Sequence, residues 1–104
     1  MDYQTKDMII NALMKVVKNA PTNSTNQYAV YSPYQKTYDI TKEQFDIWIN
    51  YVYSILKIIS SYVDVNTCLS HISNIIADPY DAYASKINTI CQKILDFART
   101  IISM

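Results

Sequence analysis

The chain has 104 residues, nine of them basic and nine acidic, so its formal net charge is zero, and half of its residues are hydrophobic. This length and composition predict one globular domain over residues 1–104. The sequence contains no glycine, which argues against the tight hairpins of a β-rich fold and against the phosphate-binding loops of nucleotide-binding folds. Because the basic residues are spread along the chain, we expect no non-specific binding of nucleic acid.

Apolar residues recur at helical spacing near the start of the chain, and they predict a first helix from about Thr5 to Asn19. Pro21 is expected to end it, since proline cannot continue a helix. The apolar positions of this helix are Met8, Ile9, Ala12, Leu13, Val16 and Val17.

The segment Gln27–Ile40 has no helical period, and it contains four tyrosines. Either Ser32-Pro33 turns a short two-stranded β-ribbon here, or the segment is extended and packs on the helices through its rings. Tyrosine gives a large contact area at low entropic cost, and its ring can stack on a nucleotide base. The candidate binding residues, for a protein or a nucleotide-type ligand, are Tyr28, Tyr31, Tyr34, Lys36, Tyr38 and Trp48. A purely structural alternative is that the tyrosines pack on the bundle and that Trp48 anchors the segment to it.

The second helix is predicted from about Lys42 to Val63. Thr41 and Gln44 have the spacing of a capping box, in which each side chain bonds the other residue's backbone N–H. Apolar residues then follow in steps of three and four, at Phe45, Ile49, Val52, Leu56, Ile59 and Val63, with Trp48 and Ile55 beside them.

Two further helices complete the prediction. Asp64 or Asn66 is expected to cap a third helix that ends near Ala77. Asp78-Pro79 predicts the start of a fourth helix, Pro79 to Ile102, because aspartate at the cap followed by proline favours a helix start. The apolar seam of this fourth helix is Tyr80, Tyr83, Ile87, Ile90, Ile94, Phe97 and Ile101. The predicted fold class is therefore all-α, a small four-helix bundle with an irregular Tyr-rich segment between its first and second helices.

The sequence shows no convergent set of residues for catalysis. Cys68 and His71 have a spacing that could ligate zinc, but a structural site needs two more ligands, and only Cys91, Asp78 or Asp81 could supply them. We therefore predict no metal, no cofactor and no enzymatic activity. The two cysteines either form a disulfide between the third and fourth helices or, as in most cytosolic proteins, remain thiols.

Several apolar residues lie off the main seams of the second and fourth helices, namely Tyr51, Ile58, Tyr62, Leu95 and Ile102. Either they face several neighbours inside the bundle, or they form the interface of a homodimer or of a groove for a partner.

Abundant isoleucine, asparagine and tyrosine indicate an AT-rich genome, such as that of a low-GC bacterium, a phage or an archaeal virus. The favoured function is a small, non-enzymatic protein-interaction module, of the kind that phages and mobile elements encode as inhibitors or adaptors of a host protein. The alternative is a small-ligand binding protein that uses the Tyr-rich segment for a nucleotide. The polar start of the chain, Met1–Lys6, predicts no signal peptide, and no apolar run is long enough for a membrane span, so we expect a cytoplasmic protein.

Overall fold

A computed structural model describes residues 1–21 and 40–104. The described residues form four helices, α1 (Tyr3–Lys18), α3 (Lys42–Ile59), α4 (Asn66–Ala77) and α5 (Tyr83–Ile102), and they contain no strand. The predicted all-α bundle is thus confirmed. The β-ribbon considered for the Tyr-rich segment falls on residues 22–39, which lie outside the described residues.

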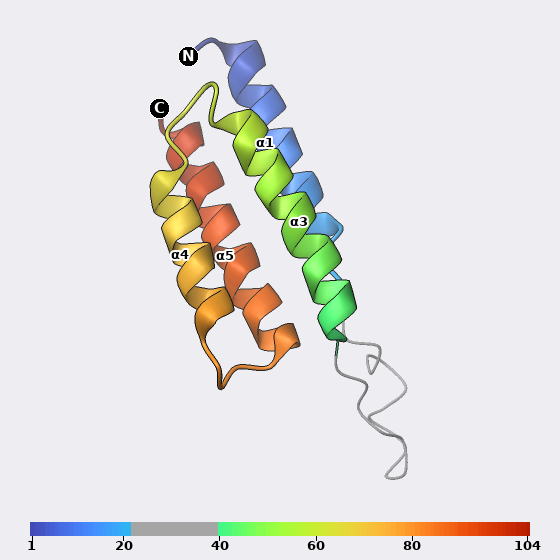
Figure 1. Cartoon of the computed structure of the whole chain (residues 1–104). Coiled ribbons are helices and arrows are strands. Elements are labelled where there is room, and N and C mark those ends of the chain that lie inside the picture. Colours follow the sequence, from blue (N-terminus) through green and yellow to red (C-terminus); the bar gives the residue numbers. More distant parts are fainter. Residues whose placement is uncertain (22–39) are drawn as a thin grey trace, which may run out of the picture.

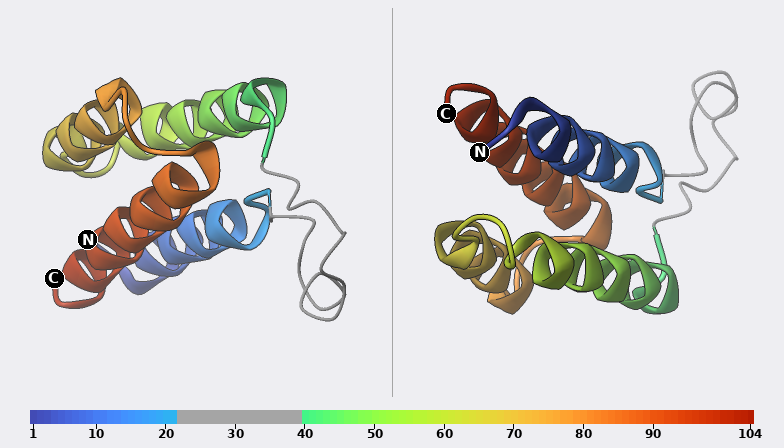
Figure 2. Two further views of the ribbon diagram at one scale, coloured as in Figure 1. Left: turned by 90° about the horizontal axis from the view of Figure 1, so that it is seen from below. Right: turned by 90° about the horizontal axis from the view of Figure 1, so that it is seen from above.

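The helices form two layers around one core. Figure 1 shows α1 antiparallel to α3 and α4 antiparallel to α5, and Figure 2 shows α3 and α4 on one side of the bundle with α1 and α5 on the other. The most extensive packing joins α5 to α1 and to α4, and α1 also packs on α3. The side chains that are buried most completely come from all four helices: Ile9, Leu13, Val16, Val52, Leu56, Ile72, Ile90, Ile94 and Ile101.

The first helix begins two residues earlier than its periodicity predicted. Asp2 occupies the N-cap position, and its carboxylate accepts the backbone N–H of Thr5 at 2.7 Å. This bond satisfies one of the donors that a helix start leaves without an internal partner. Aspartate is one of the residue types preferred at the N-cap, and the spacing of apolar residues does not contain this signal.

The capping box at the start of α3 is confirmed. The hydroxyl of Thr41 accepts the backbone N–H of Gln44 at 3.1 Å, and the side-chain oxygen of Gln44 accepts the backbone N–H of Thr41 at 3.0 Å. The predicted end at Val63 was wrong, because α3 stops at Ile59. Ser60 follows, and its hydroxyl bonds the carbonyl of Lys57, a local bond of the kind that competes with helix continuation.

We expect Thr41→Ala to lower the free energy of unfolding by about 1 kcal/mol, the usual cost of losing a threonine cap. Thr41→Ser is the matched control, because it keeps the hydroxyl that accepts from Gln44. Urea denaturation followed by circular dichroism measures both variants. Equal stability of the alanine variant and the unmodified chain would show that this cap does not stabilise the helix.

The predicted start of the last helix at Pro79 was also wrong. Helix α5 begins at Tyr83, with Ala82 at the N-cap position and no side-chain cap. The carboxylate of Asp78 instead accepts the backbone N–H of Tyr80 at 2.8 Å, so Asp78-Pro79 forms a turn between two antiparallel helices. Tyr80, which was placed on the apolar seam, precedes the helix and is 95% exposed.

The cap predicted for α4 is shifted in the same way. Val65 holds the N-cap position without a side-chain hydrogen bond, and the carboxylate of Asp64 accepts the backbone N–H of Asn66 at 2.9 Å. The acidic residue therefore lies one position outside the cap, and Asn66 is the first residue of the helix.

Two helix ends are completed by side chains from neighbouring helices. Helices commonly end with a glycine in the left-handed conformation, but this sequence has none, and no described residue has a positive φ. Trp48 of α3 donates its indole N–H to the carbonyl of Val16 at 3.1 Å, and Lys86 of α5 donates to the carbonyl of Ile76 at 2.8 Å. Each accepting carbonyl lies in the last turn of its helix, where carbonyl groups have no backbone N–H partner within the helix.

Candidate functional site

The structure describes one of the six predicted binding residues. Tyr28, Tyr31, Tyr34, Lys36 and Tyr38 all lie within residues 22–39, outside the described part of the chain.

Trp48, the sixth, is 3% exposed and bonded to α1. Its ring borders a shallow hollow of about 250 Å³ whose lining residues are Asn19, Pro21, Gln44, Ile47, Trp48 and Tyr51. Most of the indole therefore joins α1 to α3, and only its edge is available to a ligand.

The hollow lies at one end of an apolar face that α1 and α3 share. On α3, Ile47 is 65% exposed and Ile58 is 61% exposed, and Tyr51 between them is half-buried. These positions lie on one side of the helix, because eleven residues are close to three full turns. Tyr62 follows in the turn after α3 and is 51% exposed. We call the surface formed by Ile47, Tyr51 and Ile58 with the adjoining part of α1 the α1–α3 face, and it contains the exposed large hydrophobic side chains of α3.

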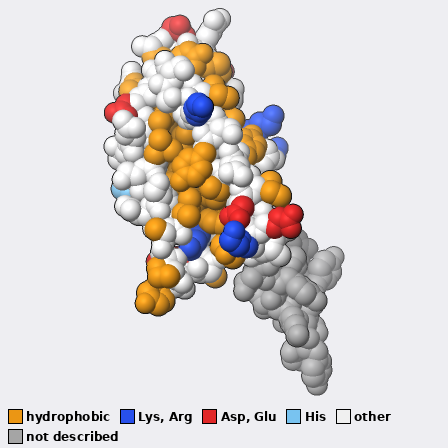
Figure 3. All heavy atoms as spheres, viewed as in Figure 1, with side chains coloured by type: hydrophobic (Ala, Val, Ile, Leu, Met, Phe, Trp, Pro, Cys, Tyr) orange, Lys and Arg blue, Asp and Glu red, His pale blue; other side chains and the backbone are white. Residues whose placement is uncertain are grey.

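A second apolar strip runs along the line where α3 and α4 meet, and Figure 3 shows it at the centre of the molecule. The hydroxyl groups of Tyr53 and Ser73 lie 3.4 Å apart across this line. Helical spacing places Leu69 and Ile76 on the same side of α4 as Ser73. The apolar residues of this strip are half-buried, so they offer less area to a partner than Ile47 and Ile58 do.

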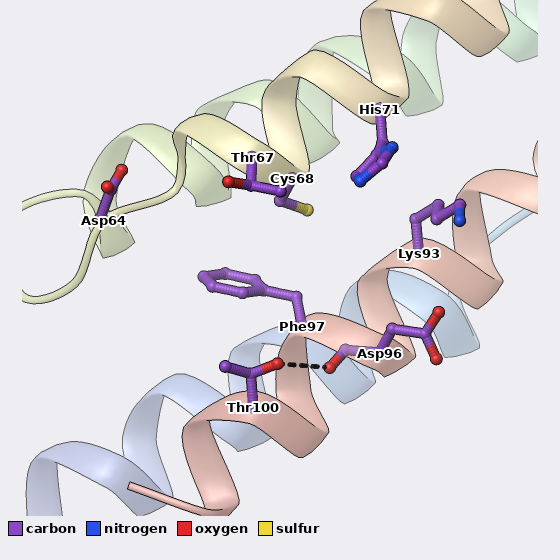
Figure 4. Close-up of a pocket in the computed structure, with 8 residues that line it drawn as sticks. All are labelled: Asp64, Thr67, Cys68, His71, Lys93, Asp96, Phe97 and Thr100. Atoms are coloured by element: carbon purple, nitrogen blue, oxygen red, sulfur yellow. Dashed lines mark hydrogen bonds between the residues drawn. The ribbon is translucent and has the colours of Figure 1, made fainter.

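The residues singled out for chemistry lie in a groove between α4 and α5. Its volume is about 360 Å³, and Figure 4 shows Cys68 and His71 of α4 facing Phe97 and Lys93 of α5. The remaining lining residues are Asp64, Thr67, Asp96 and Thr100. Asp96 is already bonded to Arg99 at 3.0 Å. The groove therefore has a small apolar floor, and six of its eight lining residues are polar or charged.

No group of three or more histidine, cysteine, aspartate or glutamate side chains gathers at metal-binding distances within residues 1–21 and 40–104. Asp78 and Asp81, considered as partners of Cys68 and His71, lie at or beyond the opposite end of α4. Cys91 lines a different groove, between α1 and α5.

Both cysteines are free thiols. Burial raises the pKa of the Cys68 thiol from its ordinary value near 9.0 to about 11, and burial also raises the pKa of Cys91. Because the thiolate is the reactive form, neither cysteine has the lowered pKa of an activated nucleophile.

We expect Cys68 to react with iodoacetamide at pH 8 on the order of a hundredfold more slowly than an unburied thiol, because a pKa of about 11 leaves so little thiolate. Its rate should keep rising with pH up to about 11. Peptide mass spectrometry separates it from Cys91, which is more exposed and should react first. Similar rates in the folded chain and in denaturant would contradict the burial of Cys68.

Comparisons with known proteins give no further information, because no family model, no curated protein and no solved structure matches the chain. None of the described helices combines the length and the apolar character that crossing a membrane requires.

Proposed function

We propose that this protein is a small, non-enzymatic interaction module that binds another protein or a second copy of itself. The observation that supports the proposal is the α1–α3 face, where Ile47 and Ile58 each expose more than half of their surface. Contiguous apolar side chains on the outside of a small domain usually mark an interface. The Tyr-rich segment belongs to the proposal on the basis of sequence alone, since tyrosine is enriched in interfaces.

The biological setting is also part of the proposal. A short neutral chain from an AT-rich genome fits an accessory protein of a phage or mobile element, acting in the cytoplasm as an inhibitor or adaptor of a larger host protein. This step rests on composition and size.

The proposal is tested by capture of partners on the immobilised full chain, with an extract of the cells that naturally contain it. We expect Tyr31→Ala combined with Tyr34→Ala, and separately Ile47→Lys, to lose the captured protein while the helical circular dichroism signal stays unchanged. Ile102→Lys is the control, because it changes an exposed isoleucine of α5. Capture that survives all of these changes would remove the support for both surfaces.

The second candidate is a small-ligand binding protein, and the groove between α4 and α5 favours it. A volume of about 360 Å³ is within the range of ligand sites, and Lys93 and His71 at its rim could meet an anionic group. The nucleotide version of this proposal also uses the rings of the Tyr-rich segment, with Lys36 or Arg99 contacting phosphate. A ligand that binds the folded state raises its melting temperature. A panel of mono-, di- and cyclic nucleotides that leaves the melting temperature unchanged would remove this candidate.

A further inference from the structure

One contact shows which residues of α1 and α3 lie at the same level along the α1–α3 face. Trp48 bonds the carbonyl of Val16, and α1 and α3 run in opposite directions. Met8 lies eight residues before Val16, so it is level with Leu56, eight residues after Trp48. Met8 is 47% exposed, so an exposed apolar residue of α1 lies at the level of the last turns of α3.

The two exposed isoleucines of α3 are centred on a point two residues beyond the middle of the helix. Ile47 and Ile58 lie on one side of α3, and the midpoint between them falls between Val52 and Tyr53. A two-fold axis that lies between two copies at the level of that midpoint, perpendicular to both helices, brings Ile58 of one copy opposite Ile47 of the other. The hollow beside Ile47 and Trp48 is then in position to receive that isoleucine.

We propose that two copies of this chain associate through the α1–α3 face about this axis, with Ile58 of each copy seated in the hollow beside Ile47 of the other. This inference rests on the proposed function, and it names a second copy of the chain as the partner. Closed two-fold contacts of this kind bury the same patch on both subunits.

The charges of α3 are complementary under the same operation. Asp46 lies near the start of the helix and Lys57 near its end, and both are on the flank beside the apolar residues. The two-fold axis brings Asp46 of one copy level with position 59 of the other, which is two residues, or about 3 Å, from Lys57. Asp46 already bonds Lys42 at 2.7 Å, but a carboxylate can accept further donors. Each dimer would thus contain two symmetric Asp46–Lys57 pairs.

The shape of the face and the net charge favour self-association as well. The axis places Tyr51 of one copy opposite Ser54 of the other, so a large side chain meets a small one. The formal net charge of the chain is zero, and two copies therefore do not repel each other at long range.

The area of the face indicates a dimer of modest affinity. The 18 residues of α3 span about 27 Å, and two adjacent helices are about 20 Å wide, which gives a face of roughly 540 Å². Stable interfaces bury about 800 Å² on each partner. We therefore expect a dissociation constant in the micromolar range.

Sedimentation velocity over a concentration series tests the proposal. We expect the full chain to change from monomer to dimer in the micromolar range, and Ile58→Lys to raise the dissociation constant about a hundredfold, because each dimer contains Ile58 twice and one lost apolar contact costs about tenfold. Ile102→Lys is the matched control: it is 58% exposed and also lies in the last turn of its helix, where a cation is favourable. It should dimerise like the unmodified chain.

A charge exchange tests the axis itself. Asp46→Lys and Lys57→Glu should each weaken self-association, because each brings like charges together across the axis. An equimolar mixture of the two variants should restore dimers, since both contacts then pair opposite charges. Loss of dimer in each single variant together with recovery in the mixture is the result that the proposed axis predicts.

A chain that stays monomeric throughout the series would overturn the self-association, and so would an Ile58→Lys variant that dimerises normally. Loss of dimer in Ile102→Lys alone would move the interface to α5 and contradict the proposed axis. These outcomes differ from failure of the interaction function, since a monomer that still captures a foreign protein through Ile47 would keep the function and lose only its proposed partner.

Discussion

Replacing Trp48 by alanine is expected to lower the free energy of unfolding by about 3–5 kcal/mol, the usual cost of removing a buried tryptophan. The side chain is 3% exposed, and its N–H satisfies the Val16 carbonyl at the end of α1. The substitution therefore leaves both a cavity and a carbonyl without a donor. Because small domains are stable by only about 5–15 kcal/mol, this single change removes a large part of the total.

Trp48→Phe separates the two contributions. Phenylalanine keeps most of the apolar volume but has no N–H, so we expect a loss of about 1–2 kcal/mol, the cost of one missing hydrogen bond. Urea denaturation measures both variants. If the phenylalanine variant were as stable as the unmodified chain, the bond to Val16 would have no net value and packing alone would explain the role of Trp48.

The second large effect is expected at Lys86, which is buried although it is charged. Its ammonium group donates to the carbonyl of Ile76 at 2.8 Å, and it lies 6.0 Å from the centre of the Tyr83 ring. A cation at the end of α4 also suits the helix dipole. We expect Lys86→Ala to lower the free energy of unfolding by about 2–3 kcal/mol, since hydrogen bonds to charged groups are worth more than neutral ones.

Lys86→Met is the informative control, because it keeps an apolar stem of similar length and removes only the donor. We expect its stability to fall between that of the alanine variant and that of the unmodified chain. A methionine variant that is more stable than the lysine would contradict our account. It would mean that the cost of removing the ammonium group from water exceeds the value of its bond, as happens for some buried ion pairs.

The parts of the fold that could be predicted from the sequence are those set by local chemistry. The Thr41–Gln44 capping box involves residues three apart, and both of its bonds are present. The alternation of apolar residues in α5 identified Ile87, Ile90, Ile94 and Ile101 as buried, whereas Phe97 of the same seam is half-buried. In both cases the deciding interactions lie within one helix or on one face of it.

The parts that were predicted wrongly depend on the path of the chain between helices. Asp78-Pro79 has the composition of a helix start, but α4 and α5 are antiparallel neighbours, and the chain needs a turn at that point. The carboxylate of Asp78 bonds the N–H of Tyr80 in that turn instead of capping a helix. The residue types at Asp78-Pro79 suit both a helix start and a turn. Which of the two forms depends on where the neighbouring helices lie, and the local sequence does not contain that information.

The candidate site was the least predictable part. The sequence offered two roles for Trp48, a binding residue and an anchor for the Tyr-rich segment, and the indole joins α1 to α3. No sequence pattern singled out Lys86, because its side chain bonds a carbonyl at the end of a different helix, α4. Among the off-seam residues predicted from the spacing, Ile58, Tyr62 and Ile102 are exposed, whereas Tyr51 and Leu95 are half-buried. The spacing therefore located apolar residues near the surface but did not indicate how exposed each of them is.

Native mass spectrometry of the protein, freshly purified from a gentle lysate, shows whether the chain acts as an interaction module or as a small-molecule binder. It reports the number of chains and any retained small molecule in one spectrum. The interaction function predicts an even-numbered oligomer, or the chain bound to another protein, with no small-molecule mass. A single chain carrying one stoichiometric small molecule would contradict it, and the groove between α4 and α5 would then become the principal site.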